Sequence, residues 1–546
     1  MRVIIQMRHS AEIHDASMGM NMVPYSLPIS SAAFSLDTNY MPVQLPDKKP
    51  RESVGATEVG RLFDFDAQPE VSTYLVRGEV ENEFALRALM LAVEGHDDGV
   101  GVFADPQIEP CIVCGGDAPV GNDQNVENLL KVLNLHAKGM DGSNVMVAIV
   151  DTGINLAHLK SKGKTPNFDA SKSWTPNPSI TPGNAPVNHG TMCAFDVCIA
   201  APNCTLLDYA LLQSTRSGGS RMDGFLSDAI KAFSQLRDML SAAPEPKPAL
   251  VVNNSWGMFH PSWDFPPGHP SNYSNNPMHP FNIAVESLED AGADILFAAG
   301  NCGADCPDGR CRGVTNMAIY GANSHPSVLC IAGVDIHKSR VGYSSQGPGR
   351  LDSKKPDLCA YTHFLGSEAF RAGSPDSGTS AACPVAAGVV AAIRSFKSPT
   401  DLPPAQLREL LRRTTEDLGA TGFDYNHGFG LINVAAILGA LDRLDIQELP
   451  VGGSLSGRLN KTDDSALFRI TVDKPIVLKL DGPSGADFDV YLRREAKPTP
   501  REFDYRGYTN SADEEVHLSA VDPGEYLILV DSYRGAGEFT LQAGVL

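Results

Sequence analysis

The stretch DSGTSAACP, residues 376–384, and the stretch VAAGVVA, residues 385–391, carry the strongest fold signal in this 546-residue chain. Gly378 permits a tight turn, and the small residues that follow it are typical of a buried helix. Ser380 is therefore expected at the start of a helix, where backbone N–H groups point toward an anion. A serine in such a corner is a candidate nucleophile if a base and an orienting acid lie elsewhere in the chain.

A candidate acid and a candidate base both lie upstream of Ser380. Asp151 follows the apolar run VMVAIV, residues 145–150, and Thr-Gly comes directly after it. The run predicts a buried strand of a parallel sheet, and ligands bind at the carboxyl ends of such strands. His189 opens a helix-like segment, residues 189–195. Taken alone, Asp151 is equally explained as a turn former, and His158 competes with His189 as the base.

Four short motifs in this order resemble the subtilisin-like serine peptidases (the S8, or subtilase, family), in which the acid, base and nucleophile follow one another along the chain. They are residues 147–153, 189–191, 298–301 and 378–380; further matches at 254–257, 343–345 and 428–431 extend the resemblance over roughly residues 125–445. The resemblance implies an α/β fold with a parallel sheet flanked by helices. It also implies residue roles: Asp151, His189 and Ser380 as catalytic triad, Asn301 as oxyanion-hole donor, and Ser255, Trp256 and Gly257 as substrate-binding residues.

The segments on either side of this region differ from it in pattern. Residues 72–80 and 100–105 are strand-like and flank a helix-like segment, 84–93, which resembles part of a subtilase propeptide. Beyond residue 446, short alternating strands predict a β-sandwich that resembles the pre-peptidase C-terminal domain. We therefore expect three domains: a small α+β propeptide-like or retained accessory domain (1–124), a peptidase domain (125–445) and a β-sandwich (446–546). If the first domain is a prodomain, the active chain should begin between about residues 106 and 130.

The charge and hydropathy of the chain limit the classes of molecule that it is expected to bind. The net charge of −21 argues against nucleic acid and anionic membranes as partners, and no apolar stretch is long enough to span a bilayer. We expect peptide or protein substrates and make no prediction of oligomeric state. The first residues give no convincing signal peptide, which predicts a cytoplasmic protein, whereas the family resemblance predicts a secreted one.

Several cysteine and acidic side chains are candidate metal ligands. Cys302, Cys306 and Cys311 lie in one loop after Asn301, and CxxC occurs at 111–114. Zinc requires four ligands at suitable spacing, so disulfides or plain thiols are expected and no metal is assigned. Asp487 and Asp489 are candidate ligands for a structural calcium ion, but solvated edge charges explain them as well. No cofactor is required for the chemistry.

These observations predict a serine endopeptidase that forms an acyl-enzyme. The alternative is a vestigial peptidase that serves as a protein- or polysaccharide-binding module. An α/β-hydrolase esterase is disfavoured, because Ser380 lacks the Gly-x-Ser-x-Gly turn and the acid precedes the histidine in this chain.

Overall fold

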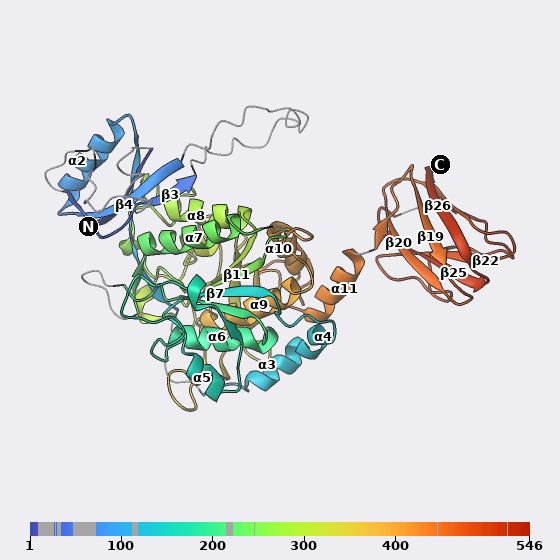
Figure 1. Cartoon of the computed structure of the whole chain (residues 1–546), viewed down its shortest axis with the longest axis horizontal. Coiled ribbons are helices and arrows are strands. Elements are labelled where there is room, and N and C mark those ends of the chain that lie inside the picture. Colours follow the sequence, from blue (N-terminus) through green and yellow to red (C-terminus); the bar gives the residue numbers. More distant parts are fainter. Residues whose placement is uncertain are drawn as a thin grey trace. The chain divides into compact units, whose positions relative to one another are not determined.

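The computed structural model describes the whole chain except residues 9–26, 28, 30–33, 47–71, 112–117, 215–221, 245, 445 and 521. It divides into two compact units, Met1–Ile437 and Leu438–Leu546 (Figure 1). The division into three domains at 124 and 445 stays a prediction. No helix among the described residues is long and apolar enough to cross a membrane.

A seven-stranded parallel sheet forms the centre of the first unit. Its strand order is β15-β14-β13-β11-β7-β9-β8, and its central strands are mostly apolar and have every residue buried, as a sheet covered on both faces requires. The bounds are β7 (Val145–Val150), β8 (Asn167–Phe168), β9 (Thr205–Tyr209), β11 (Ala249–Asn254), β13 (Ala293–Ala298), β14 (Leu329–Val334) and β15 (Leu358–Tyr361).

Two helical layers cover this sheet. Helices α6 (His189–Ala200) and α9 (Thr379–Arg394) pack together on one face, and α7 (Leu226–Ser241) and α8 (Pro280–Asp290) pack together on the other (Figure 1). Every residue of α6 and α9 is buried, which explains their many small side chains. Other α-helices of this region are α3 (Asp123–Leu130), α4 (Val132–His136), α5 (Leu156–Ser161) and α10 (Pro404–Arg413), and α11 (Val434–Leu444) spans the boundary between the two units. The predicted parallel sheet flanked by helices is confirmed.

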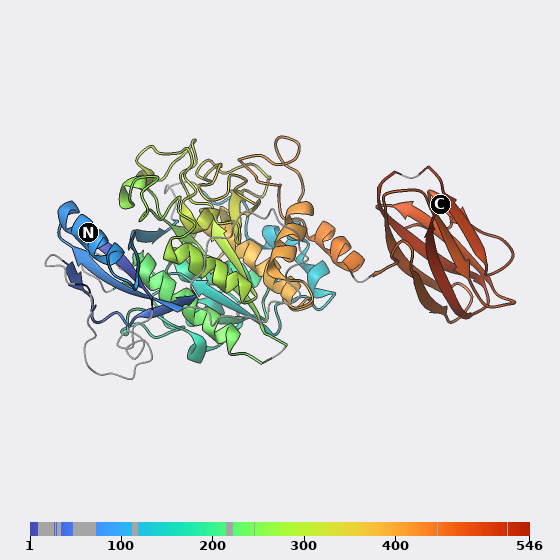
Figure 2. The same ribbon diagram turned by 90° about the horizontal axis from the view of Figure 1, so that it is seen from above.

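The amino-terminal residues form a small α+β layer of their own. An antiparallel sheet of order β2-β4-β1-β5, with β3 also paired to β4, packs against helix α2 and has its own apolar core. Figure 2 shows this sheet, in blue, beside α7 and α8. The bounds are β1 (Arg2–Met7), β2 (Phe34–Leu36), β3 (Val43–Pro46), β4 (Ser72–Val80), α2 (Glu83–Glu94) and β5 (Gly99–Ala104). The predicted strand–helix–strand order is present, and β1 to β3 were not predicted.

The carboxyl-terminal unit is a β-sandwich, as predicted. One sheet has the order β18-β20-β25-β22-β23 and the other β19-β26-β21-β24, and alternate side chains from both sheets form one core. The bounds are β18 (Gln447–Glu448), β19 (Ser454–Leu459), β20 (Ser465–Val472), β21 (Ile476–Asp481), β22 (Asp487–Arg494), β23 (Tyr505–Gly507), β24 (Glu514–Leu518), β25 (Gly524–Arg534) and β26 (Gly537–Val545).

Candidate functional site

The imidazole of His189 meets the carboxylate of Asp151 at the carboxyl end of β7. Nδ1 of His189 lies 2.8 Å from Oδ1 and 3.0 Å from Oδ2 of Asp151, and both side chains are buried. Thr152 N–H also donates to Asp151 Oδ1 over 2.7 Å, which fixes the carboxylate. A Cβ on Gly190 would lie 2.7 Å from the carbonyl oxygen of Gly153, so only glycine lets α6 approach this turn. The carboxylate can therefore hold one imidazole tautomer, with Nδ1 protonated.

The competing histidine has a different partner. Nε2 of His158 lies 2.8 Å from the carbonyl oxygen of Ser367, and His158 N–H donates to Asn155 Oδ1. Of these two candidate bases, His189 is the one that is hydrogen-bonded to Asp151.

Ser380 is the second residue of α9. Gly378 precedes the helix with a φ of 83°, the left-handed conformation that favours glycine. The Ser380 hydroxyl is buried and donates to two carbonyl oxygens, 2.9 Å to Cys111 and 3.1 Å to Ser255. Nε2 of His189 is buried and has no hydrogen-bond partner among the described residues. It is thus available to accept a proton.

The amide of Asn301 contacts the same carbonyl of Cys111. Asn301 follows β13 through Gly300, whose φ of 97° turns the chain sharply. Its Nδ2 donates to Cys111 O over 2.7 Å, and its Oδ1 accepts from Thr379 N at 3.0 Å and from Thr379 Oγ1 at 3.1 Å. The side chain is therefore oriented by the start of α9 and presents its N–H donor to a carbonyl oxygen that also accepts from Ser380.

The segment that ends at Cys111 lies in an extended conformation between two strands. Strand β6 (Gln107–Pro110) pairs antiparallel with β10 (Gly224–Phe225) on one side and with β12 (Trp256–Gly257) on the other. Cys111 N–H then donates to Ser255 O over 3.1 Å. The chain thus lays its own residues 107–111 across the predicted substrate-binding residues, with a peptide carbonyl beside Ser380 and Asn301. The pairing of residues 107–111 with β10 and β12 was not predicted.

The predicted substrate-binding residues contribute mainly through their backbone. Trp256 and Gly257 form the strand that pairs with β6, and Ser255 supplies a carbonyl oxygen. The Trp256 ring is fully buried and contacts the rings of Phe281 and Phe297, which assigns it to the core.

Helices α7 and α8 hold the segment that leads into β6. Asp105 accepts from Ser227 N at 2.9 Å and from Ser227 Oγ at 3.0 Å, in the first turn of α7, where a carboxylate is favoured by the helix dipole. The Ala104 carbonyl oxygen lies 2.9 Å from Nε2 of His279, next to α8. Burial lowers the pKa of His279 to about 4, so this ring is neutral at pH 7 and donates to Ala104.

The acid pair Asp196 and Asp376 is poorly suited to the role expected of Asp151, and Cys193 beside Asp151 and His189 is poorly suited to metal binding. Burial raises the pKa of Asp376 to about 7 and, together with repulsion from Asp376, raises the pKa of Asp196 well above its usual range. This buried acid pair therefore retains a proton at neutral pH. Asp151, His189 and Cys193 offer ligand atoms within 4.8 Å of one another. Burial raises the pKa of the Cys193 thiol well above its usual range, which disfavours a thiolate ligand.

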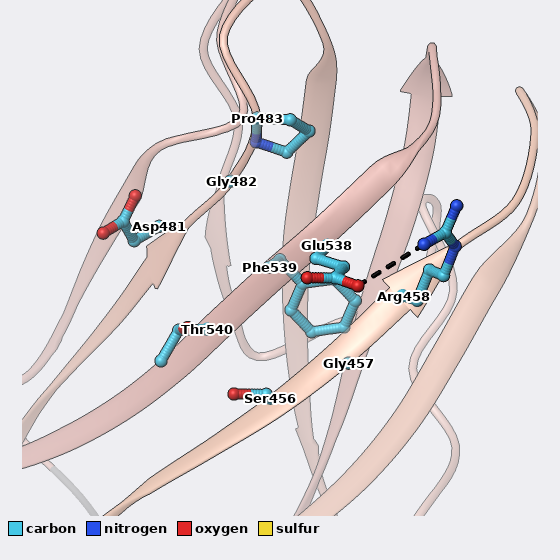
Figure 3. A pocket seen from close by; sticks show the side chains of 9 residues that line it. All are labelled: Ser456, Gly457, Arg458, Asp481, Gly482, Pro483, Glu538, Phe539 and Thr540. Atoms are coloured by element: carbon cyan, nitrogen blue, oxygen red, sulfur yellow. Dashed lines mark hydrogen bonds and ion pairs between the residues drawn. The ribbon is translucent and has the colours of Figure 1, made fainter.

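A separate pocket lies in the carboxyl-terminal unit. Figure 3 shows it against strands β19, β21 and β26, with the ion pair between Arg458 and Glu538 at 3.4 Å. Both charged side chains are largely exposed, and the pocket contains no candidate nucleophile with a base. Its residues are Ser456, Gly457, Arg458, Asp481, Gly482, Pro483, Glu538, Phe539 and Thr540. None of the predicted catalytic or substrate-binding residues lines this pocket.

Comparison with protein families matches two regions of the chain. Residues 142–430 match the model of the subtilase family, and residues 464–532 match the bacterial pre-peptidase C-terminal domain. The first region contains Asp151, His189, Asn301 and Ser380.

Individual relatives are similar at moderate identity. The chain is 25% identical over 404 residues to the "calcium-dependent protease" of Trichormus variabilis, covering 63% of this chain and 56% of that protein. It is 28% identical over 252 residues to the "halolysin-like extracellular serine protease Nep" of Natrialba magadii, covering 40% and 45%. It is 27% identical over 316 residues to a subtilisin of Bacillus pumilus, covering 56% and 95%. The matched region thus spans about half the length of the first two relatives.

Proposed function

Since this chain belongs to the subtilase family, we propose that it is a serine endopeptidase with Ser380 as nucleophile, His189 as base and Asp151 as orienting acid. The observation that carries the proposal is the peptide carbonyl of Cys111, which accepts hydrogen bonds from both Ser380 Oγ and Asn301 Nδ2. A carbonyl between a nucleophile and an amide donor is the arrangement that acyl transfer requires.

The same contacts support an ordered mechanism. Ser380 Oγ attacks a substrate carbonyl carbon while its proton passes to Nε2 of His189, and the Asp151 carboxylate stabilises the resulting imidazolium. Asn301 Nδ2 donates to the oxyanion that develops on the carbonyl oxygen. The peptide C–N bond then breaks, the departing amine takes the proton from His189, and water hydrolyses the acyl-enzyme with His189 again accepting a proton.

The first substrate in this proposal is the chain itself. Residues 107–111 lie between β10 and β12 as a substrate strand would, and this places the bond after Cys111 next to Ser380. Cleavage there would separate residues 1–111 from the remainder. The hydrogen bonds of Asp105 and Ala104 to α7 and α8 would keep the released segment docked and the cleft occupied.

A calcium site and secretion are further parts of the proposal. Oδ1 of Asp487 is buried without a hydrogen-bond partner among the described residues, and Asp489 pairs in register with Asp531 on the neighbouring strand. Carboxylate oxygens of this kind suit Ca²⁺, and two relatives are named calcium-dependent proteases. We propose these residues as ligands of a structural calcium ion. Secretion is proposed because one relative is named an extracellular protease.

Labelling with a fluorophosphonate probe separates this function from the vestigial binding module. The probe forms a phosphorus–oxygen bond with an activated serine and releases HF, so an active enzyme gains the mass of one probe less HF, and fragmentation should locate it on Ser380. His189→Ala should lower the labelling rate by several orders of magnitude, because Oγ then lacks its base. An exposed serine such as Ser161 should stay unlabelled. A wild-type protein that gains no probe mass supports the binding-module alternative.

A further inference from the structure

The carboxylate of Glu109 is held by the guanidinium of Arg310, beside the catalytic cleft. Arg310 Nη1 lies 2.8 Å from Glu109 Oε2, and only 25% and 17% of the two side chains are exposed. Gln107 Nε2 donates to the other carboxylate oxygen of Glu109 over 2.9 Å. Both oxygens of this β6 side chain therefore have a donor, and an ion pair this well screened from solvent is stronger than a surface pair.

The Arg310 side chain is oriented by contacts with Asp308 and Phe259, which belong to the same part of the chain. Its Nε and Nη2 each donate to Asp308 over 2.9 Å, one to each carboxylate oxygen, and its guanidinium lies 3.7 Å from the centre of the Phe259 ring. The two contacts hold the planar group on one face and one edge, and Nη1 donates to Glu109. The Asp308 carboxylate neutralises part of the positive charge of Arg310 through Nε and Nη2, whereas Nη1 donates to Glu109.

The loop that carries Arg310 begins at the oxyanion-hole candidate. Asp308 N–H donates to the carbonyl oxygen of Asn301 over 2.8 Å, and a disulfide joins Cys302 to Cys311. This disulfide agrees with the expectation of disulfides or thiols in the loop. Both ends of the loop are thus tied beside Asn301, which fixes the guanidinium relative to the reacting carbonyl.

The register of β6 sets which substrate residue Arg310 contacts. Glu109 pairs with Gly257 and lies two residues before Cys111, so it is the third residue on the amino side of the proposed cleavage site. Resting on the proposed peptidase function, we propose that Arg310 forms a subsite that selects an acidic side chain at this third position in peptide substrates. The subsite is built by the enzyme part of the chain, so it remains after residues 1–111 are released.

Peptides that differ at one position test this subsite. Internally quenched peptides with the sequence of residues 107–113, QIEPCIV, are compared with versions in which the Glu is Gln or Lys, using the processed enzyme from which residues 1–111 have been removed. We expect kcat/KM for the Glu peptide to exceed that of the Gln peptide about tenfold and that of the Lys peptide by more, because a charge-assisted hydrogen bond is lost and then replaced by repulsion. The dependence should weaken as salt is raised.

Two variants and one control assign the preference to Arg310. Arg310→Gln should bring the Glu and Lys peptides to within about threefold of each other, and Arg310→Glu should favour the Lys peptide. Arg312→Gln is the matched control, since Arg312 is exposed on the same loop, and the Glu preference should persist.

The outcomes separate this inference from the proposed function. Equal rates for the three peptides, or no cleavage of any of them by an enzyme that labels with fluorophosphonate, overturn the subsite while leaving the peptidase intact. A Glu preference that survives in Arg310→Gln also overturns it. A protein that neither labels nor cleaves any peptide refutes the proposed function instead.

Discussion

Ser380→Ala is expected to lower the turnover of a peptide substrate about 10⁶-fold, because the substitution removes the proposed nucleophile, whose hydroxyl contacts the Cys111 carbonyl oxygen. The fold should survive. The two carbonyl oxygens that accept from the hydroxyl each have a second donor: Asn301 Nδ2 for Cys111 O, and Cys111 N–H for Ser255 O. No buried acceptor is therefore left without a partner.

Turnover of an internally quenched peptide, together with thermal unfolding, checks this expectation. Ser377→Ala is a suitable control, since Ser377 lies three residues away in the same motif and has no assigned role. Residual Ser380→Ala activity within tenfold of wild type, from a preparation free of contaminating protease, would remove Ser380 from the mechanism.

Asn301→Asp is expected to lower kcat by about two to three orders of magnitude with little change in KM, because the donor acts on charge that develops during attack. Aspartate retains the Oδ1 that accepts from Thr379 N and Oγ1. It replaces the Nδ2 donor with an oxygen that repels an oxyanion. Asn301→Leu also removes the donor, but it would leave the buried Thr379 N–H without its acceptor, at a cost of about 1–3 kcal/mol of stability.

Steady-state kinetics and thermal unfolding of Asn301→Asp and Asn301→Leu, measured side by side, separate the two roles of this amide. Both variants should lose kcat, and Asn301→Leu should also lose stability. If Asn301→Asp turns over substrate at the wild-type rate, Asn301 is a turn residue and another group must stabilise the oxyanion.

The parallel sheet and the sandwich could be predicted because their signals are local. The run at 145–150 and the run before Ala298 are apolar without interruption, and Phe468, Ile470 and Val472 alternate with polar residues. Each pattern indicates by itself which of its residues are buried. The candidate site could also be assembled from the sequence, because each of its residues follows an apolar strand or opens a small-residue helix. The roles of these residues stay a prediction.

Features that depend on long-range pairing could not be predicted. In the sequence, β1 is only a short apolar run near the amino terminus. In the fold, this strand pairs with β4, which lies about seventy residues later. Residues 107–111 form a short segment that includes Pro110, and nothing local indicates that they lie between β10 and β12. Arg310 lies in a Gly/Asp-rich loop of ordinary composition. Its contact with Glu109 spans 201 residues and becomes visible only in the fold.

The amino-terminal sequence of the purified protein tests most directly whether Ser380 cleaves the peptide held beside it. Wild-type protein, denatured and analysed by intact mass and amino-terminal sequencing, should yield two chains, one ending at Cys111 and one beginning at Ile112. Ser380→Ala should yield a single chain that retains residues 107–113. An uncut wild-type chain that hydrolyses peptides at full rate, or a Ser380→Ala chain cut after Cys111 in the absence of other proteases, would contradict the account.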